Sequence, residues 1–294
     1  MARIPLEDNF IDIINKAQRG LKITDADLAQ RAEVSLADLA ALKSGRPLIP
    51  VLRRIARHLR LGPDALEAMA AHSWYPAQPN FPSGFAAFNT PFEDMTVNSY
   101  LIWDARTRQA AAFDTGADCT AMLDTLHADN LQLKYIFLTH THVDHVADLE
   151  KLMASTKAEV WGHQIEPPPI ATGRTFKENV HFHLGPLSIK TLLTSGHSPG
   201  MTTYYITGLS WPVAIVGDAI FAGSMGGSAT AFDEQLRNNK EKILKLPRDT
   251  VLACGHGPLS TIGQEKQHNA FFARECILTL FCQWFYTPHV SFLN

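Results

Sequence analysis

Residues 139–145 read THTHVDH and form the most informative segment of the sequence. It follows an apolar run at residues 134–139 that is typical of a buried strand. His140 and His142 are two residues apart, so in extended backbone their side chains point the same way. Asp144 and His145 come next, where we expect the chain to turn into a helix. Imidazole nitrogen beside carboxylate oxygen suits zinc, iron or manganese better than calcium or magnesium, so the loop is predicted to bind a transition metal.

Three more polar residues share two features, because each follows a strand-like run and has a glycine neighbour. They are His197 after residues 187–193, Asp218 after residues 213–216, and His256 after residues 250–253. Glycine tolerates unusual backbone angles and lets the backbone approach an ion closely. We therefore expect further metal ligands at the ends of these later strands. Ser195 and Ser198 also lie near His197, but such proximity is weak evidence for a serine–histidine pair.

Taken in order, these residues resemble the metallo-β-lactamase fold superfamily. The match consists of the T-H-x-H-x-D-H motif at 139–145, then His197, Asp218 and His256, with Asp114-Thr115-Gly116 as the family's early strand-end motif. The resemblance covers about residues 83–272. It implies an α/β protein, an αββα sandwich with its site along one edge.

The resemblance also implies a role for each residue of the site. One metal would be bound by His140, His142 and His197, the second by Asp144, His145 and His256, and Asp218 would bridge both. Asp114 would fix the loop of residues 139–145. We assign Asp144 and Asp114 as the catalytic carboxylates. The cofactors would be two divalent ions, with zinc as the first expectation and iron or manganese as alternatives.

The implied chemistry is hydrolysis of a small-molecule substrate. Two metals about 3.5–4 Å apart can share a hydroxide and stabilise both the attacking and the leaving group. Metal-bound water ionises near neutral pH, so that hydroxide would attack a carbonyl without any side-chain nucleophile.

Residues 217–221 and 255–263 look like the glyoxalase II-like branch, whose members hydrolyse thioesters such as hydroxyacylglutathione. The sequence departs from this branch in two ways, so the thiol carrier of the substrate is not assigned. Only about 38 residues follow His256, so we expect the further helical domain of that branch to be absent. The loop 224–228 also lacks the arginine often found there. A related type, the persulfide dioxygenase, would use one iron held by His140, His197 and Asp218, and this sequence contains the residues of both schemes.

Residues 1–72 have the pattern of short helices. Thr24 followed by Asp27, and Ser35 followed by Asp38, look like two helix caps with a tight turn between them. This segment resembles the Cro/phage-repressor helix-turn-helix family. We predict a small all-α helix-turn-helix domain at residues 1–72, a proline-rich linker at 73–82, and a metallo-β-lactamase-like hydrolase domain at 83–294.

DNA is a candidate partner of this first domain, through residues 24–60. The basic side chains there that would meet phosphates are Arg53, Arg54, Arg57 and Arg60. The expected recognition helix, residues 36–43, is rich in alanine, and only Lys43 suits the reading of base edges. We therefore place interaction or dimerisation, as a homodimer, ahead of sequence-specific DNA binding. A DNA-binding regulator with the metal domain as a sensor remains the alternative function.

Composition is that of an ordinary globular protein, with 46% hydrophobic and 19% charged residues in a chain of 294. A formal net charge of -3 does not single out nucleic acid as a partner. Neither a signal-peptide core nor a run of about 20 apolar residues is present, so we expect a cytoplasmic protein that does not span a membrane. The four cysteines lack a C-x-x-C pair, which predicts reduced thiols at Cys119, Cys254, Cys276 and Cys282.

Overall fold

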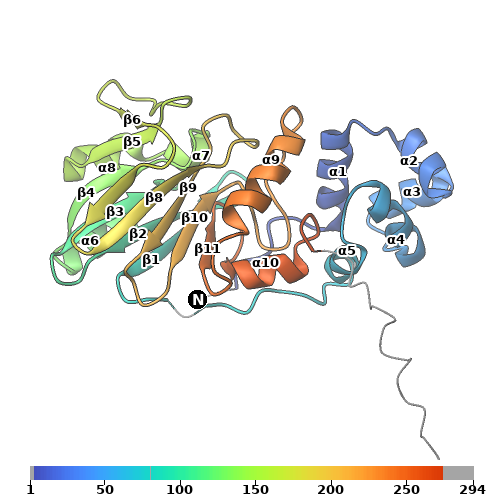
Figure 1. Ribbon diagram of the computed structural model, residues 1–294, viewed down its shortest axis with the longest axis horizontal. Coiled ribbons are helices and arrows are strands. Elements are labelled where there is room, and N and C mark those ends of the chain that lie inside the picture. Colours follow the sequence, from blue (N-terminus) through green and yellow to red (C-terminus); the bar gives the residue numbers. More distant parts are fainter. Residues whose placement is uncertain (1–2, 80, 274–294) are drawn as a thin grey trace, which may run out of the picture.

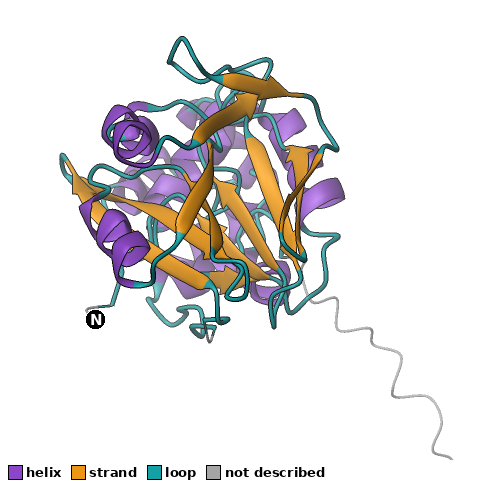
Figure 2. Cartoon of the chain, turned by 90° about the vertical axis from the view of Figure 1, so that its left-hand side faces the viewer, coloured by secondary structure: helices purple, strands orange, loops and turns teal. Residues whose placement is uncertain are grey.

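Two six-stranded sheets form the centre of the protein in the computed structural model, which describes residues 3–79 and 81–273. The first sheet has the order β1 (Phe85–Phe92), β2 (Met95–Trp103), β3 (Gln109–Phe113), β4 (Gln132–Phe137), β5 (Glu159–His163) and β6 (Arg174–Phe176). The second has the order β12 (Ser260–Thr261), β11 (Val251–Cys254), β10 (Val213–Gly217), β9 (Thr202–Thr207), β8 (Leu187–Leu193) and β7 (His181–Leu184). The sheets lie inside and the helices outside, so the predicted αββα sandwich is confirmed (Figures 1 and 2).

Strand direction explains where the polar loops meet. In the first sheet β3 and β4 are parallel. In the second, β9 is antiparallel to both β8 and β10, and β10 is parallel to β11, so β8, β10 and β11 all run the same way. The carboxyl ends of parallel strands lie at one edge of a sheet, so the loops after these strands gather there. β10 and β11 are buried along their whole length, as their continuous apolar sequences predict.

Aromatic side chains fill the space between the two sheets. The rings of Phe113, Phe137 and Tyr204 have centroids 5.1 to 5.4 Å apart, in stacked, tilted and edge-on arrangements. Helices α6 (Thr120–Ala128) and α8 (Leu149–Thr156) bury apolar side chains against the outer face of the first sheet. Helices α9 (Phe232–Asn238), continued by the π-helix η1 (Asn239–Ile243), and α10 (Ile262–His268) belong to the layer over the second sheet.

Five helices precede the sandwich, namely α1 (Phe10–Leu21), α2 (Asp25–Ala32), α3 (Leu36–Lys43), α4 (Ile49–His58) and α5 (Pro63–Ala70). The two predicted caps are confirmed, because Thr24 accepts from the Asp27 amide at 3.1 Å and Ser35 from the Asp38 amide at 3.0 Å. The identity of this region as a helix-turn-helix domain stays a prediction.

The helical region and the sandwich share one hydrophobic cluster, which joins buried residues of α1 to α5 with residues of β10, α9 and α10. Figure 1 shows α9 and α10 between the sheets and helices α1 to α5. Helices α1 and α9 pack closely, because any side chain at Gly20 would overlap the ring of Phe232. The helical region is therefore packed firmly against the layer that contains α9.

Two further expectations concern features away from the site. Cys119 and Cys254 are buried free thiols, whereas Cys276 and Cys282 lie outside the described residues. Across residues 3–79 and 81–273, no helix combines the length and the apolar character needed to cross a bilayer.

Candidate metal centre

The polar residues singled out in the sequence follow five different strands and meet at one edge of the sandwich. The loop containing His140, His142, Asp144 and His145 follows β4 and includes the short helix α7 (Val143–Val146), while Asp114, His197, Asp218 and His256 follow β3, β8, β10 and β11. The two sheets are joined at this edge by a hydrogen bond of 2.8 Å from the Thr202 amide to the Thr139 carbonyl. Every residue predicted for the site is therefore brought to the same region.

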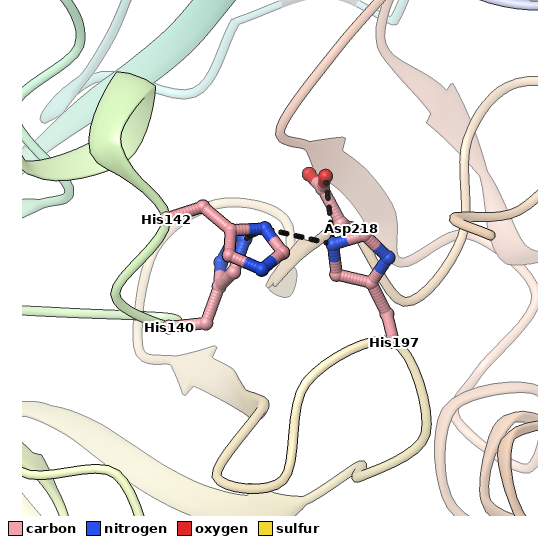
Figure 3. Close-up of side chains that lie close together, drawn as sticks. All are labelled: His140, His142, His197 and Asp218. Carbon is pink, nitrogen blue, oxygen red and sulfur yellow. Dashed lines mark hydrogen bonds and ion pairs between the residues drawn. The ribbon is translucent and has the colours of Figure 1, made fainter. Parts of the chain in front are cut away.

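The first cluster consists of His140, His142, His197 and Asp218, whose ligand atoms all lie within 4.8 Å of one another. His140 Nε2 lies 3.0 Å from His142 Nδ1, which in turn lies 3.1 Å from His197 Nε2. Asp218 Oδ2 lies 3.4 Å from His197 Nε2. Figure 3 shows the three imidazoles and the carboxylate turned toward a common point.

The second cluster consists of Asp144, His145 and His256. Asp144 Oδ2 lies 3.2 Å from His256 Nε2 and 3.5 Å from His145 Nε2. Asp218 also reaches this cluster, with Oδ1 3.3 Å from His145 Nε2 and Oδ2 3.5 Å from His256 Nε2. The carboxylate of Asp218 therefore lies between the two groups of ligand atoms and contacts both.

These spacings fit divalent metal ions. Ligand atoms at the corners of a tetrahedron with bonds of roughly 2.1 Å are about 3.4 Å apart, close to the separations seen here. Two buried atoms, His145 Nε2 and Asp218 Oδ1, lie 3.3 Å apart but form no hydrogen bond with each other or with any other described residue. Buried polar atoms without partners are rare in folded proteins, so both point to an occupant that the side chains alone do not supply. Imidazole and carboxylate donors suit a divalent metal in that place.

Hydrogen bonds hold four of the five imidazoles in the orientation that a metal ligand needs. In each of these rings Nδ1 faces a protein oxygen, which leaves the lone pair of Nε2 directed into the site. The contacts are His197 to the Gly227 carbonyl at 2.9 Å, His256 to the Thr96 carbonyl at 2.8 Å, His145 to Asp114 Oδ2 at 2.8 Å, and His140 to Thr139 Oγ1 at 3.0 Å. Thr139 donates its own proton to Asp114, so its oxygen accepts from His140.

The charges of the site favour a cation. Burial alone would raise the pKa of Asp218, but His145 and His256 outweigh burial and hold it well below its usual value, so the carboxylate is ionised. Burial would likewise lower the pKa of His145, yet Asp218 and Asp114 raise it to about 10, so without a metal the ring keeps a proton on Nε2 that a bound cation would replace. Burial and the neighbouring His145 lower the pKa of His140, which keeps that ring neutral and able to coordinate.

Two glycines allow the ligands to converge. Gly217 has a φ of 49°, and a Cβ there would lie 2.7 Å from Thr139 Cβ, so the turn into Asp218 requires glycine. A Cβ on Gly255 would overlap Asp218 Oδ1 and lie 2.6 Å from His145 Cε1. Glycine is therefore required at both positions because the backbone passes close to neighbouring side chains.

Asp114 holds the loop of residues 139–145 from beneath. Its two carboxylate oxygens accept from the Thr139 amide and from the Thr139 hydroxyl, both at 2.7 Å. The contact with His145 Nδ1 is the third on the same carboxylate. Asp114 is 2% exposed, so these three donors satisfy a buried charge while fixing one end of the loop and one ligand ring.

Glu166 is a residue of the site that sequence reasoning missed. Its carboxylate accepts from the amide and the hydroxyl of Thr141, both at 2.8 Å, and also from the Gly200 amide at 2.8 Å and the Ser198 hydroxyl. It therefore ties the loop after β4 to the loop that contains His197. Burial alone would raise the pKa of Glu166, but these hydrogen bonds lower it. The sequence around Glu166 has no motif that would have revealed this role.

Glu166→Ala is expected to weaken the contact between the two loops. It removes four hydrogen bonds and leaves the amides of Thr141 and Gly200 without their acceptor, which should lower the free energy of unfolding by roughly 1–3 kcal/mol. Urea unfolding of the metal-free protein measures this change. Glu150→Ala, on an exposed position of α8, is the matched control. An unfolding free energy equal to that of the wild type would contradict the bracing role of Glu166.

The two serines beside His197 form hydrogen bonds with residues other than the histidine. Ser198 donates to Glu166 and Ser195 donates to Glu234, so neither hydroxyl is paired with the imidazole. The serine–histidine pair considered from the sequence is therefore not formed.

Comparison with known proteins identifies the family. Residues 93–256 match the model of the Metallo-beta-lactamase superfamily, and the chain belongs to that superfamily. It is 28% identical over 203 residues to a probable metallo-hydrolase of Bacillus subtilis, YqgX, a match that covers 62% of this chain and 94% of the relative. It is also 28% identical over 197 residues to the hydroxyacylglutathione hydrolase GloC of Haemophilus influenzae, covering 59% of this chain and 92% of the relative.

A third relative and two solved structures agree with this assignment. The hydroxyacylglutathione hydrolase of Bartonella henselae is 33% identical over 174 residues, covering 59% of this chain and 65% of the relative. The crystal structure of BLEG-1 B3 metallo-beta-lactamase has a TM-score of 0.57 at 28% identity, covering 64% of this chain and 100% of that one. ETHE1 from Myxococcus xanthus, with a TM-score of 0.54 at 24% identity over 63% of this chain and 83% of that one, shares the fold.

Proposed function

We propose that this protein is a metal-dependent hydrolase with a dinuclear centre. In this proposal His140, His142 and His197 hold one ion, Asp144, His145 and His256 hold the other, and Asp218 bridges the two. The observation that carries the proposal is the position of the Asp218 carboxylate, which lies within 3.5 Å of ligand nitrogens in both clusters. Zinc is our first expectation for both ions, with iron or manganese as alternatives.

The residues around the ligands define what the site can do. When bound, a pair of divalent ions supplies Lewis acidity and lowers the pKa of a water molecule near them. Asp114 keeps the His145 ring in a single orientation, and Gly227 and Thr96 do the same for His197 and His256. Asp144 is half-buried at the edge of the second cluster and its pKa is lowered chiefly by His256 despite burial, so we assign it as an ionised catalytic carboxylate.

We propose a thioester, or a related acyl compound, as the substrate. Support comes from relatives named as hydroxyacylglutathione hydrolases, which match the chain over 59% of its length. The thiol carrier is left open, since the loop 224–228 has no basic residue of its own.

Hydrolysis of a panel of acyl thioesters by metal-reconstituted protein tests this function. His140→Ala is expected to lower turnover strongly, because it removes a ligand of the first cluster. His181→Ala is the matched control, since His181 is exposed on β7, the edge strand at the end of the second sheet away from β10 and β11. Full hydrolysis by the His140 variant, or no hydrolysis of any thioester by wild-type protein with both ions bound, would contradict the proposal.

A mononuclear iron persulfide dioxygenase is the second candidate. It is supported by the first cluster, which by itself gathers His140, His197 and Asp218, the three residues that such an iron would need. Its signature would be one iron per chain together with oxygen consumption on a persulfide substrate. The second cluster favours the hydrolase, because a mononuclear centre gives Asp144 and His256 no ligand role.

For the helical region we propose an interaction or self-association role ahead of DNA binding. Several of its arginines contact the protein itself, among them Arg53 with Asp64 and Glu67, Arg54 with the Glu33 carbonyl, and Arg60 with Asp233. Helix α3 exposes Leu36 to 57%, and its Lys43 pairs with Asp25 at 2.8 Å. Sedimentation across a concentration series tests self-association. A DNA mobility shift that strengthens as salt falls would favour the regulator instead.

A further inference from the structure

The loop of residues 224–228 positions two of the proposed ligands. The Gly227 carbonyl accepts from His197 Nδ1 at 2.9 Å, and the Gly226 amide donates to the Asp218 carbonyl at 3.1 Å. The loop packs directly on the ligand, because a Cβ on Gly226 would lie 2.8 Å from His197 Nδ1. A shift of this loop would therefore move the His197 ring and the backbone of Asp218 together.

Part of the support for this loop comes from the sandwich. Gln235 of α9 donates to the Gly226 carbonyl at 2.9 Å, and Asn269, just after α10, donates to the Ser224 carbonyl at 2.6 Å. Both contacts lie in the same layer as the loop. Neither contact involves the Met225 carbonyl or the Ser224 hydroxyl, which form hydrogen bonds with another part of the chain.

Those partners come from the helical region, more than 200 residues earlier in the chain. Lys16 of α1 donates from Nζ to the Met225 carbonyl at 3.0 Å and to Asp8 Oδ2 at 2.5 Å. Asp8 also accepts from the Ser224 hydroxyl. Lys16 Nζ lies 5.0 Å from the ring centroid of Phe221, whose ring meets His256 edge-on at 5.6 Å. Lys16 and Asp8 thus contact the loop at a backbone carbonyl, that of Met225, and at a side chain, the Ser224 hydroxyl.

The local sequence explains how Lys16 and Asp8 come together. Asn9 caps α1, so Asp8 immediately precedes the capping residue, and Lys16 follows about two turns later. Side chains on a helix point back toward its N-terminus, which directs Lys16 toward Asp8. The side chains are only 19% and 6% exposed, so the charges are largely removed from water and depend on each other. Removing one member of such a pair leaves the other charge buried without compensation.

We infer that Lys16 and Asp8 are positioning residues of the metal centre. They hold the loop 224–228 so that the Gly227 carbonyl orients His197 toward its ion, which makes the helical region a structural part of the site. This inference rests on the proposed function, since it requires the first cluster to bind a metal. Neither residue touches the coordinating atoms of the ligands. Because they act through the orientation of His197, their replacement should lower metal affinity at the first cluster.

Lys16→Met tests the inference, because methionine keeps an unbranched apolar stem and removes the ammonium. Metal affinity is measured by competition with a chromophoric chelator, and we expect one of the two ions to bind about 10-fold more weakly. The visible spectrum of the cobalt-substituted protein should also change, as it reports the ligand geometry around His197. Lys43→Met is the matched control, since it breaks an ion pair of 2.8 Å in the same helical region. Lys16→Arg keeps a donor for the Met225 carbonyl and should therefore retain the metal affinity of the wild type.

The possible results distinguish a failure of the positioning role from a failure of the proposed metal-dependent function. Wild-type affinity for both ions in folded Lys16→Met would overturn the positioning role. If that variant does not fold, Asp8→Asn replaces it, and unchanged affinity there would equally overturn the role. Weaker binding of one ion in either variant, with unchanged binding in Lys43→Met, supports it. Wild-type protein that binds no metal would instead overturn the proposed function.

Discussion

Replacing Asp218 by alanine is expected to lower thioester hydrolysis by on the order of 10³-fold. The side chain contacts ligand atoms of both clusters, at 3.3 to 3.5 Å, so its loss removes the one carboxylate that the two ions are proposed to share. We also expect metal affinity to fall at both clusters. Steady-state turnover and chelator competition on the same preparation measure the two effects together.

Asp124→Ala is the control for this experiment, because it removes an exposed carboxylate from α6 on the outer face of the first sheet. That variant should keep wild-type turnover and metal content. Circular dichroism of both metal-free variants establishes that each is folded. Turnover in Asp218→Ala within 10-fold of the wild-type value would rule out a bridging role for this residue.

Asp114→Asn is expected to weaken metal binding by about 10- to 100-fold without removing any ligand. Three donors, from the Thr139 amide, the Thr139 hydroxyl and His145, converge on the two carboxylate oxygens. An amide of the same size keeps one oxygen and turns an NH₂ group toward these donors, so at least one of them loses its acceptor. The effect should be larger at the second cluster, because His145 belongs to it.

Asp104→Asn is the matched control for Asp114→Asn. Asp104 is 9% exposed and accepts from the Thr107 amide at 2.9 Å, in the turn between β2 and β3. Its replacement should alter stability while leaving metal affinity unchanged. Equal metal affinities in the Asp114 variant and the wild type would contradict the role of Asp114 in fixing His145.

The site loops were predictable because their chemistry is local in sequence. The motif at 139–145 directly follows an apolar run, and His197, Asp218 and His256 each follow another, so strand ends and candidate ligands could be found together. The caps at Thr24 and Ser35 were predictable for the same reason, since a cap and its partner are three residues apart. In each case the pattern lies within a few residues.

Other features depend on contacts that no short pattern records. Strand β1 was not predicted, because after the buried Phe85 it alternates half-buried and exposed residues, contains Pro91, and lies at the sheet edge, where proline is tolerated. Glu166, Lys16 and Asp8 are ordinary charged residues in sequence. They reach the site only because the fold brings distant segments together. The hydrophobic cluster shared by the helical region and the sandwich could not be predicted for the same reason, because a linker in the sequence does not indicate whether the segments on its two sides pack together.

Elemental analysis of the wild-type protein, after reconstitution and removal of loosely bound ions, tests most directly whether the two clusters of ligand atoms, joined by Asp218, each hold a divalent ion. We expect two equivalents of metal per chain, with the second lost in His256→Ala. A single equivalent that is unaffected by His256→Ala, or no bound metal at all, would contradict it.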